Sequence, residues 1–164
     1  MKKPTIIIVA LLVFGMCHAQ EISQFTVNHL ALSVKDVNQS AQFYQNIFNL
    51  REIINVEKTK DVRCFSFGDG RELHLISSVK RTVKTNKAIH LALSTSHLET
   101  FIENLKQSNI QFYDWKGKKN RADRRKNGVQ EIYLQDPDGY WIQVNSNEKW
   151  FSLISLDQPN WLAE

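Results

Sequence analysis

The residues HLALS at positions 29–33 decide the fold, because the same five residues return at positions 90–94, sixty-one residues further on. A repeat of this period indicates a duplicated supersecondary unit. Leucine alternates with small or polar residues in both copies, and the β-branched residues Val27 and Ile89 come shortly before them, which is typical of strands. We therefore predict two related halves, each of which opens with a strand.

Each predicted strand precedes a helical pattern. Asp36 can cap the first helix, which is expected to end at Asn49, and Thr95 or Ser96 can cap the second. The apolar residues recur at helical spacing: Val37, Ala41, Tyr44, Ile47 and Phe48 in the first helix, and Leu98, Phe101, Ile102 and Leu105 in the second. Both helices are expected to cover the outside of a sheet.

Three further strands are predicted in each half. They cover residues 51–57, 62–67 and 72–77 in the first half, and lie near 111–115, 129–135 and 140–145 in the second. Tight turns, GDG at 68–70 and DPDG at 136–139, join the last two strands of each half. The predicted fold class is α+β: two βαβββ modules, at about 25–79 and 87–146, forming a curled mixed sheet around a concave site with the helices outside.

The first 19 residues have the outline of a secretory signal peptide. Lys2 and Lys3 precede an apolar run at 6–14, and Ala19 supplies the small residue before a cleavage site. The run is about half of the ~20 residues that span a bilayer, so we expect no stable membrane anchor. We predict an exported protein, periplasmic or secreted, with one domain at 20–147 and an aromatic tail at 148–164. Lipid attachment at Cys17 is the less favoured alternative.

Charge and cysteine content limit the possible partners. The net charge of +4 falls to about +2 when Lys2 and Lys3 leave with the signal, which does not favour nucleic acid as a partner. Only Cys64 remains after cleavage, so it forms no internal disulfide and is expected to fill a strand. A basic stretch at 116–126 fits either a solvated loop or an anion-attracting lid over a pocket, and its charges are Lys116, Lys118, Lys119, Arg121, Arg124, Arg125 and Lys126.

Side-chain alternation along the strands brings polar residues to one face. His29 and His90 point to the open face of their halves, because the leucines beside them point to the core. By the same alternation, Glu72 and His74 face the open side in the first half, and Gln143 does so in the second. The prediction is a pair of polar positions from each half around one concavity.

These segments resemble, in order and over essentially the whole mature chain, the landmark motifs of the vicinal oxygen chelate superfamily of glyoxalases, dioxygenases and bleomycin-resistance proteins. The motifs are NHLAL at 28–32, FY at 43–44, ELHL at 72–75, IHLA at 89–92 and DPDGYWIQ at 136–143. The resemblance implies that a divalent metal (Zn, Ni, Fe or Mn) is held by His29, His74, His90 and Gln143 in a site for a small-molecule substrate. It also implies a homodimer, with the aromatic tail as the candidate contact.

The sequence departs from that family at two positions. Metal-dependent members usually carry glutamate where this chain has Gln143, which offers a neutral carbonyl oxygen and cannot act as a base. We therefore predict weaker metal binding and assign the catalytic base to Glu72, with Glu131 as the other acid nearby and an exposed structural glutamate as the alternative. Ser33 stands where glutathione-using relatives often carry arginine, and export removes the protein from the glutathione-rich cytoplasm, which disfavours a glyoxalase I reaction.

Two functions stay open. The first is a metal-dependent lyase, isomerase or dioxygenase of glyoxalase-like type that acts on a small oxygen-rich molecule. The second is a metal-free binding or sequestering protein of the bleomycin-resistance type. In either case the pocket is expected to present aromatic stacking surfaces and polar groups, from Ser33, Phe65, Trp115, Arg121, Tyr133 and Trp141.

Overall fold

The structure is a computed structural model that describes residues 25–78 and 83–146. The predictions of a signal peptide, of lipid attachment at Cys17 and of a tail at 148–164 lie outside the described residues. Within them, no helix is both long and apolar enough to cross a bilayer.

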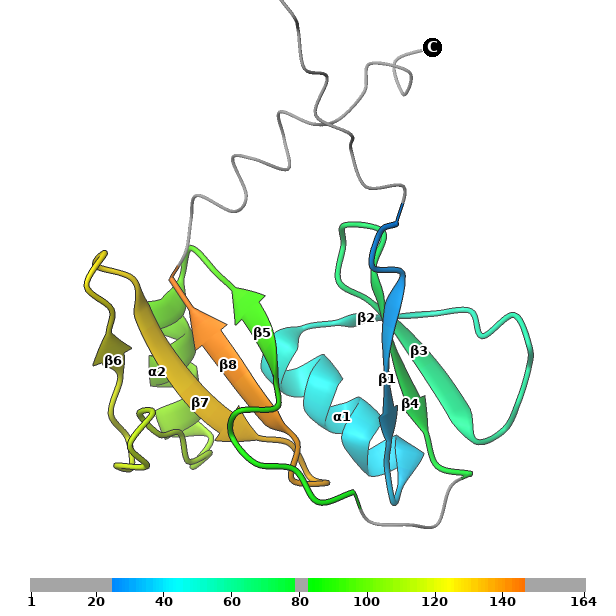
Figure 1. The fold of residues 1–164 in the computed structure, drawn as a ribbon. Coiled ribbons are helices and arrows are strands. Elements are labelled where there is room, and N and C mark those ends of the chain that lie inside the picture. Colours follow the sequence, from blue (N-terminus) through cyan, green and yellow to red (C-terminus); the bar gives the residue numbers. More distant parts are fainter. Residues whose placement is uncertain (1–24, 79–82, 147–164) are drawn as a thin grey trace, which may run out of the picture.

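The first half forms a four-stranded mixed sheet with helix α1 against it (Figure 1). Its elements are β1 (His29–Ser33), α1 (Val37–Phe48), β2 (Arg51–Ile53), β3 (Val62–Ser66) and β4 (Glu72–Ile76). The strand order is β1-β4-β3-β2, and β1 runs parallel to β4. Asp36 caps α1 as predicted, because its carboxylate accepts hydrogen bonds from the Asn38 and Gln39 backbone N–H groups at 2.8 and 3.1 Å.

The second half repeats this topology. Its elements are β5 (His90–Ser94), α2 (Leu98–Gln107), β6 (Asp123–Arg124), β7 (Gln130–Gln135) and β8 (Trp141–Asn145). The strand order is β5-β8-β7-β6, and β5 runs parallel to β8. The predicted α+β fold of two repeated modules is therefore confirmed, and the two sheets do not close into one barrel.

One hydrophobic core joins the two halves. It contains Leu73 and Leu75 of β4 as well as Ile142 of β8, all fully buried. Between the helices, the Phe48 and Phe101 rings pack with centroids 5.5 Å apart. The leucines that flank the predicted site residues on β4 therefore do face the core.

The turn at 136–139 ties the second half to the first. The buried Tyr44 hydroxyl of α1 donates a 2.9 Å hydrogen bond to Asp136, and the Ser40 hydroxyl donates to Asp138 at 2.7 Å. In the other direction, the Tyr140 hydroxyl donates to the Ser33 carbonyl oxygen at 2.9 Å. These polar contacts fix how the end of β1 lies against the start of β8.

Two predicted strands differ from the structure. The segment 51–57 is a strand only to Ile53, because the Asn55 side-chain amide donates to the carbonyl oxygens of Thr59 and Val62 and turns the chain. The segment 111–115 forms isolated bridges at Tyr113 instead of a strand, and the fourth strand of this sheet is β6, which we did not predict.

The cap of the second helix also differs. His97, and not Thr95 or Ser96, occupies the N-cap position of α2, and its side chain makes no cap hydrogen bond. The Thr95 hydroxyl instead accepts from the His97 backbone N–H at 3.0 Å, which closes a turn one step before the helix.

Candidate functional site

The predicted site residues of the first half lie together on β1 and β4. The His29 and His74 rings stack face to face with centroids 4.3 Å apart and an interplanar angle of 7°. Glu72 accepts a 2.7 Å hydrogen bond from Nε2 of His74, and the Asn28 side-chain oxygen lies 2.7 Å from Nδ1 of His29. Parallel pairing of β1 with β4 produces this cluster, which we call half-site 1 (His29, Glu72 and His74).

His90 of the second half is held in one tautomer. Its Nδ1 lies 2.8 Å from the Lys87 carbonyl oxygen, which can only accept, so Nδ1 carries the proton. In the neutral ring Nε2 then keeps a lone pair, which is the arrangement that metal-binding histidines use. The ring packs edge-on against Tyr133, with centroids 5.6 Å apart.

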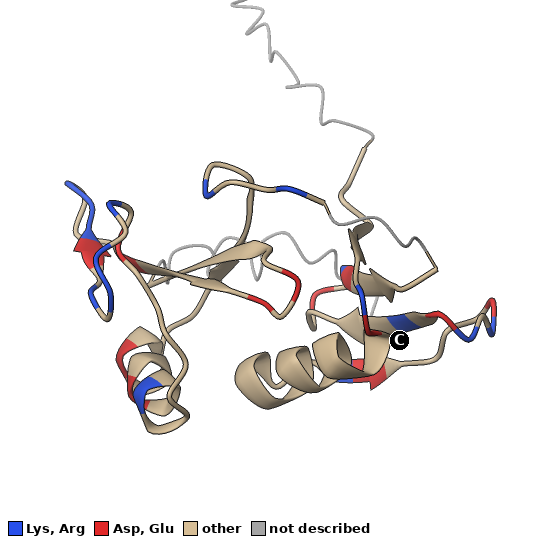
Figure 2. Cartoon of the chain, turned by 90° about the horizontal axis from the view of Figure 1, so that it is seen from below, with Lys and Arg blue, Asp and Glu red and all other residues tan. Residues whose placement is uncertain are grey.

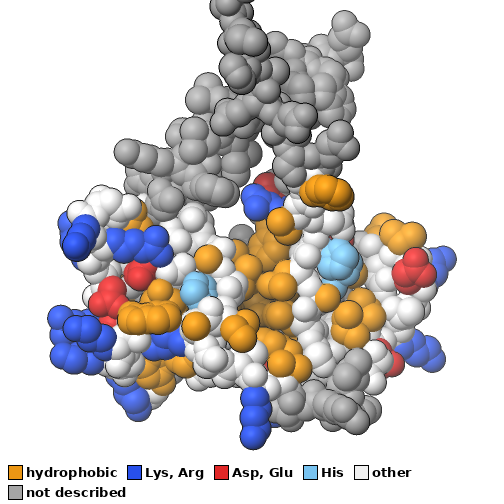
Figure 3. All heavy atoms as spheres, viewed as in Figure 1, with side chains coloured by type: hydrophobic (Ala, Val, Ile, Leu, Met, Phe, Trp, Pro, Cys, Tyr) orange, Lys and Arg blue, Asp and Glu red, His pale blue; other side chains and the backbone are white. Residues whose placement is uncertain are grey.

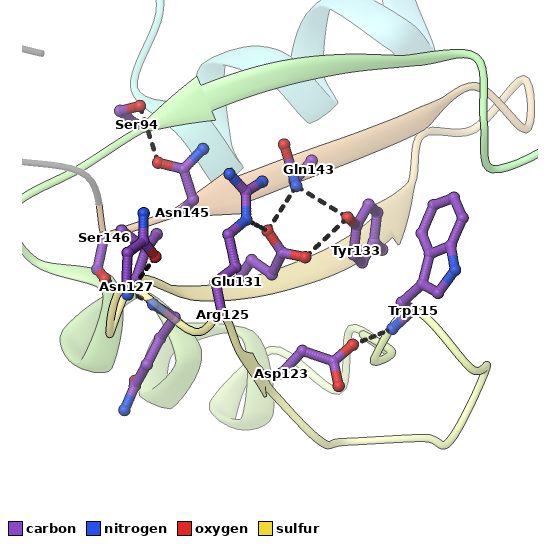
Figure 4. A network of polar contacts seen from close by, with 12 residues as sticks. Ser94, Trp115, Asp123, Arg125, Asn127, Glu131, Tyr133, Gln143, Asn145 and Ser146 are labelled. Carbon is purple, nitrogen blue, oxygen red and sulfur yellow. Dashed lines mark hydrogen bonds and ion pairs between the residues drawn. The ribbon is translucent and has the colours of Figure 1, made fainter.

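Gln143 of β8 belongs to a buried polar network (Figure 4). Its Nε2 donates at 2.8 Å both to Glu131 and to the Tyr133 hydroxyl, and Tyr133 donates to the other Glu131 oxygen at 3.1 Å. Arg125 donates to the same Glu131 oxygen that accepts from Gln143. Burial and the charge of Glu131 raise the pKa of Tyr133 to about 12, so its hydroxyl stays protonated near neutral pH. We call His90 and Gln143 half-site 2.

An aromatic enclosure next to half-site 2 holds the Lys87 ammonium group. Its Nζ lies 4.6 Å from the centroid of Trp141 and 5.5 and 5.8 Å from those of Tyr133 and Tyr113. It also donates to the carbonyl oxygens of Asp114 and Trp115 at 3.0 and 3.3 Å. Cation–π attraction and these two hydrogen bonds fix a positive charge beside the site.

The predicted pocket residues Trp115, Arg121 and Ser33 lie in different places. Trp115 is exposed and packs on Tyr133 with centroids 5.5 Å apart. Arg121 is largely exposed, with Nε 3.8 Å from Asp114, and Ser33 ends β1 with its carbonyl bonded to Tyr140.

Phe65 does not belong to the pocket. It is paired with Leu73 across β3 and β4, so its side chain shares the core face of Leu73 and is fully buried. Cys64, on the opposite face, lies in strand β3 as predicted; it is buried, and burial raises the pKa of its thiol.

The two half-sites do not meet within one chain. Among residues 25–78 and 83–146, no group of three or more His, Cys, Asp or Glu side chains could hold a metal ion. Figure 3 shows the histidines of this face in two separate places, over β1 and over β5, with hydrophobic side chains between them. A single chain thus presents two incomplete sets of donors.

The basic stretch lies at the β6 end of the second half (Figure 2). Acidic groups hold it there: the Trp115 backbone N–H donates to Asp123, the Lys118 backbone N–H donates to Asp114 at 2.7 Å, and Arg125 pairs with Glu131. Through the hydrogen bonds of Arg125 to Glu131 and of Glu131 to Gln143, this stretch is connected to half-site 2.

Sequence patterns did not reveal Lys87, Tyr113 or Arg125 as neighbours of the site. Lys87 comes three residues before the second HLALS copy and Arg125 lies in a run of similar charges, so neither is distinguished by a motif. Only the register of β7 on β8, which places Tyr133 opposite Gln143, identifies the side chains around Gln143.

Comparisons with known proteins agree with this fold. The model of the Glyoxalase/Bleomycin resistance protein/Dioxygenase superfamily matches residues 26–144. The chain is 23% identical over 127 residues to "Glyoxylase I 4" of Arabidopsis thaliana, covering 73% of this chain and 69% of that protein. It is 24% identical over 124 residues to the metallothiol transferase FosB of Bacillus licheniformis, covering 73% and 74% of the two chains.

A solved structure shares the fold. The structure titled "Oxidase ChaP-H2" superposes with a TM-score of 0.63 at 18% identity, over 76% of this chain and 95% of that one. The repeated βαβββ topology, the two half-sites and a family model that spans most of the chain lead to one conclusion: this protein belongs to the glyoxalase/bleomycin resistance protein/dioxygenase superfamily.

Proposed function

We propose that this protein is an exported metal-dependent enzyme, a lyase, isomerase or dioxygenase that acts on a small oxygen-rich molecule. Its divalent metal is held by His29, His74, His90 and Gln143. The observation that carries the proposal is the hydrogen bond from Nδ1 of His90 to the Lys87 carbonyl oxygen, which leaves the lone pair of Nε2 available to a metal ion. The signal-like segment at 1–19 supports export.

The donor set fits a divalent transition metal. Three imidazoles and a side-chain carbonyl oxygen suit Zn, Ni, Fe or Mn, and the outward oxygen of Gln143 is the end of its amide that bonds neither Glu131 nor Tyr133. The Glu72 carboxylate holds His74, which is the partner that a ligand histidine usually has. With no acid among the four ligands, the metal is expected to bind more weakly than in relatives with a glutamate.

A second copy of the chain is proposed to complete the site. β1 and β5 each pair on one side only among the described strands, and each carries one half-site. The exposed apolar residues Val27 and Ile89 lie two residues before β1 and one residue before β5. In a dimer with twofold symmetry, β1 of each copy can meet β5 of the other, which joins His29 and His74 with the His90 and Gln143 of a second copy.

Residues around the metal supply the remaining chemistry. The metal, when bound, supplies a Lewis acid for the substrate's oxygens. Among residues 25–78 and 83–146, Glu72 is the acid that bonds a predicted ligand histidine, so it either accepts a substrate proton or orients His74. Lys87 provides a fixed positive charge within the aromatic enclosure, which favours a substrate with anionic oxygens.

Elemental analysis of the mature protein, purified without chelator or histidine tag, tests the proposal. We expect stoichiometric metal in the unaltered protein and none in a His29→Ala/His90→Ala variant. His97→Ala is the matched control, because His97 is an exposed histidine at the start of α2, and it should keep its metal. No metal above background after reconstitution would overturn the enzyme proposal.

The alternative is a metal-free binding protein, and the neutrality of Gln143 favours it. In that case the exposed Trp115, which packs on Tyr133, offers a stacking surface for an aromatic ligand. Tryptophan fluorescence separates the two functions: a ligand that binds equally well with and without chelator supports the alternative, and one that needs added metal supports the enzyme.

A further inference from the structure

We propose that Glu131 is a positioning residue, which fixes the Gln143 amide so that its carbonyl oxygen faces the metal. This inference rests on the proposed function, because it concerns the ligand that replaces the family's usual glutamate. In this proposal, Glu131 on β7 supplies the negative charge that Gln143 on β8 lacks.

A glutamine ligand needs a partner that orients it. The two ends of a side-chain amide are nearly equal in size, but only the oxygen has a lone pair for a metal. Without a fixed partner, Gln143 would present either end to the open face. A glutamate has no such ambiguity, so the replacement creates this requirement.

Glu131 satisfies the requirement because an ionised carboxylate can only accept hydrogen bonds. Nε2 of Gln143 must therefore turn toward it, at 2.8 Å, and its other hydrogen goes to the Tyr133 hydroxyl at 2.8 Å. Tyr133 donates its own hydrogen to Glu131 at 3.1 Å, so it accepts from Gln143. A flipped amide would place the Gln143 oxygen against the carboxylate, where lone pairs repel.

Burial strengthens this arrangement. Gln143, Glu131 and Tyr133 are 4%, 7% and 3% exposed, so their hydrogen bonds compete with little water. Arg125 supplies the positive charge that a buried carboxylate needs, and it comes from the basic stretch. Figure 4 shows the consequence: the Gln143 nitrogen turns toward Glu131 and Tyr133, and the oxygen points away from them.

Strand register explains why these side chains meet. Tyr133 lies directly opposite Gln143 in the antiparallel pair of β7 and β8, and Glu131 is two residues earlier on the same face of β7. Arg125 follows β6, which pairs beside Glu131 through Asp123. The negative charge of Glu131 thus lies one strand away from Gln143, and Arg125 neutralises it at the oxygen that also accepts from Gln143.

Zinc affinity of the dimer, measured by titration with Zn²⁺ alone, tests the inference. In Glu131→Gln, the oxygen of the new amide stays with Arg125 and its NH₂ group faces the Tyr133 hydroxyl, which can then no longer donate to residue 131. The Tyr133 hydrogen turns to Gln143 instead and draws the Gln143 oxygen inward. We expect a loss of affinity of about 10- to 100-fold, the usual effect of removing a residue that orients a ligand. Glu103→Gln, an exposed acid on α2, is the control and should bind as the unaltered protein does.

A double variant separates positioning from a structural effect. In Glu131→Gln/Gln143→Glu the ligand has two equivalent oxygens and needs no orientation, so affinity should return to that of the unaltered protein or exceed it. If Glu131→Gln binds Zn²⁺ normally, or if the double variant stays as weak, the positioning role is wrong while the proposed function stands. If the unaltered protein binds no Zn²⁺, both are overturned.

Discussion

The hydroxyl of Tyr44 is a buried polar group whose removal should lower stability. It is fully buried and donates to Asp136, whose pKa is raised because the carboxyl is buried. Tyr44→Phe leaves a buried carboxyl with one partner fewer. We expect the free energy of unfolding to fall by about 1–3 kcal/mol, measured by chemical denaturation.

Tyr113→Phe is the matched control for that change. The Tyr113 hydroxyl bonds only a nearby, exposed Gln111 side chain at 2.9 Å, so its loss should change stability by less than about 0.5 kcal/mol. Equal losses in the two variants would contradict the importance given to the contact between the halves.

The raised pKa of Tyr133 predicts that the free energy of unfolding depends on pH. Its pKa of about 12 in the folded protein exceeds the value near 10 expected for an unfolded chain. Its contribution to stability is therefore full below pH ~10 and is lost as the pH rises toward 12. The free energy of unfolding should fall less steeply over that range in Tyr133→Phe than in the unaltered protein, and parallel curves would contradict the assignment.

Among single elements, the tight turns between paired strands contribute to stability. Gly139 closes the turn at 136–139 with a φ of +88°, and its N–H donates to Asp136. Gly139→Ala should lower the free energy of unfolding by more than about 1 kcal/mol, because alanine is strained in that conformation. A thermal midpoint equal to that of the unaltered protein would show that the turn adapts.

The positions of the helices and strands could largely be predicted from the sequence, because the spacing of apolar residues and the identity of turn residues are local signals. The HLALS copies, the α1 helix after Asp36 and the turn at 136–139 are all confirmed. The errors arise where a tertiary contact overrides a local pattern. Asn55 ends β2 early, and pairing with Leu73 turns Phe65 into the core.

At the scale of the whole molecule, the duplication could be predicted but the relation of the two halves could not. A repeat specifies each module, whereas which edges meet depends on pairings far apart in the sequence or between chains. Half-site 1 and half-site 2 each gather the residues that alternation assigned to the open face. Their union in one metal site stays a prediction, and in this account it requires a second copy.

Complementation between two variants, each of which lacks one half-site, tests most directly whether two copies of the chain share the metal site. One variant carries His29→Ala/His74→Ala and the other His90→Ala/Gln143→Ala, and the mixed dimer is purified through two different tags that are then removed. We predict that neither variant binds Zn²⁺ alone, while the mixed dimer binds roughly one ion, because one intact half-site of each copy meets the other. A mixed dimer without Zn²⁺, beside an unaltered protein that binds it, would contradict a site shared between two copies.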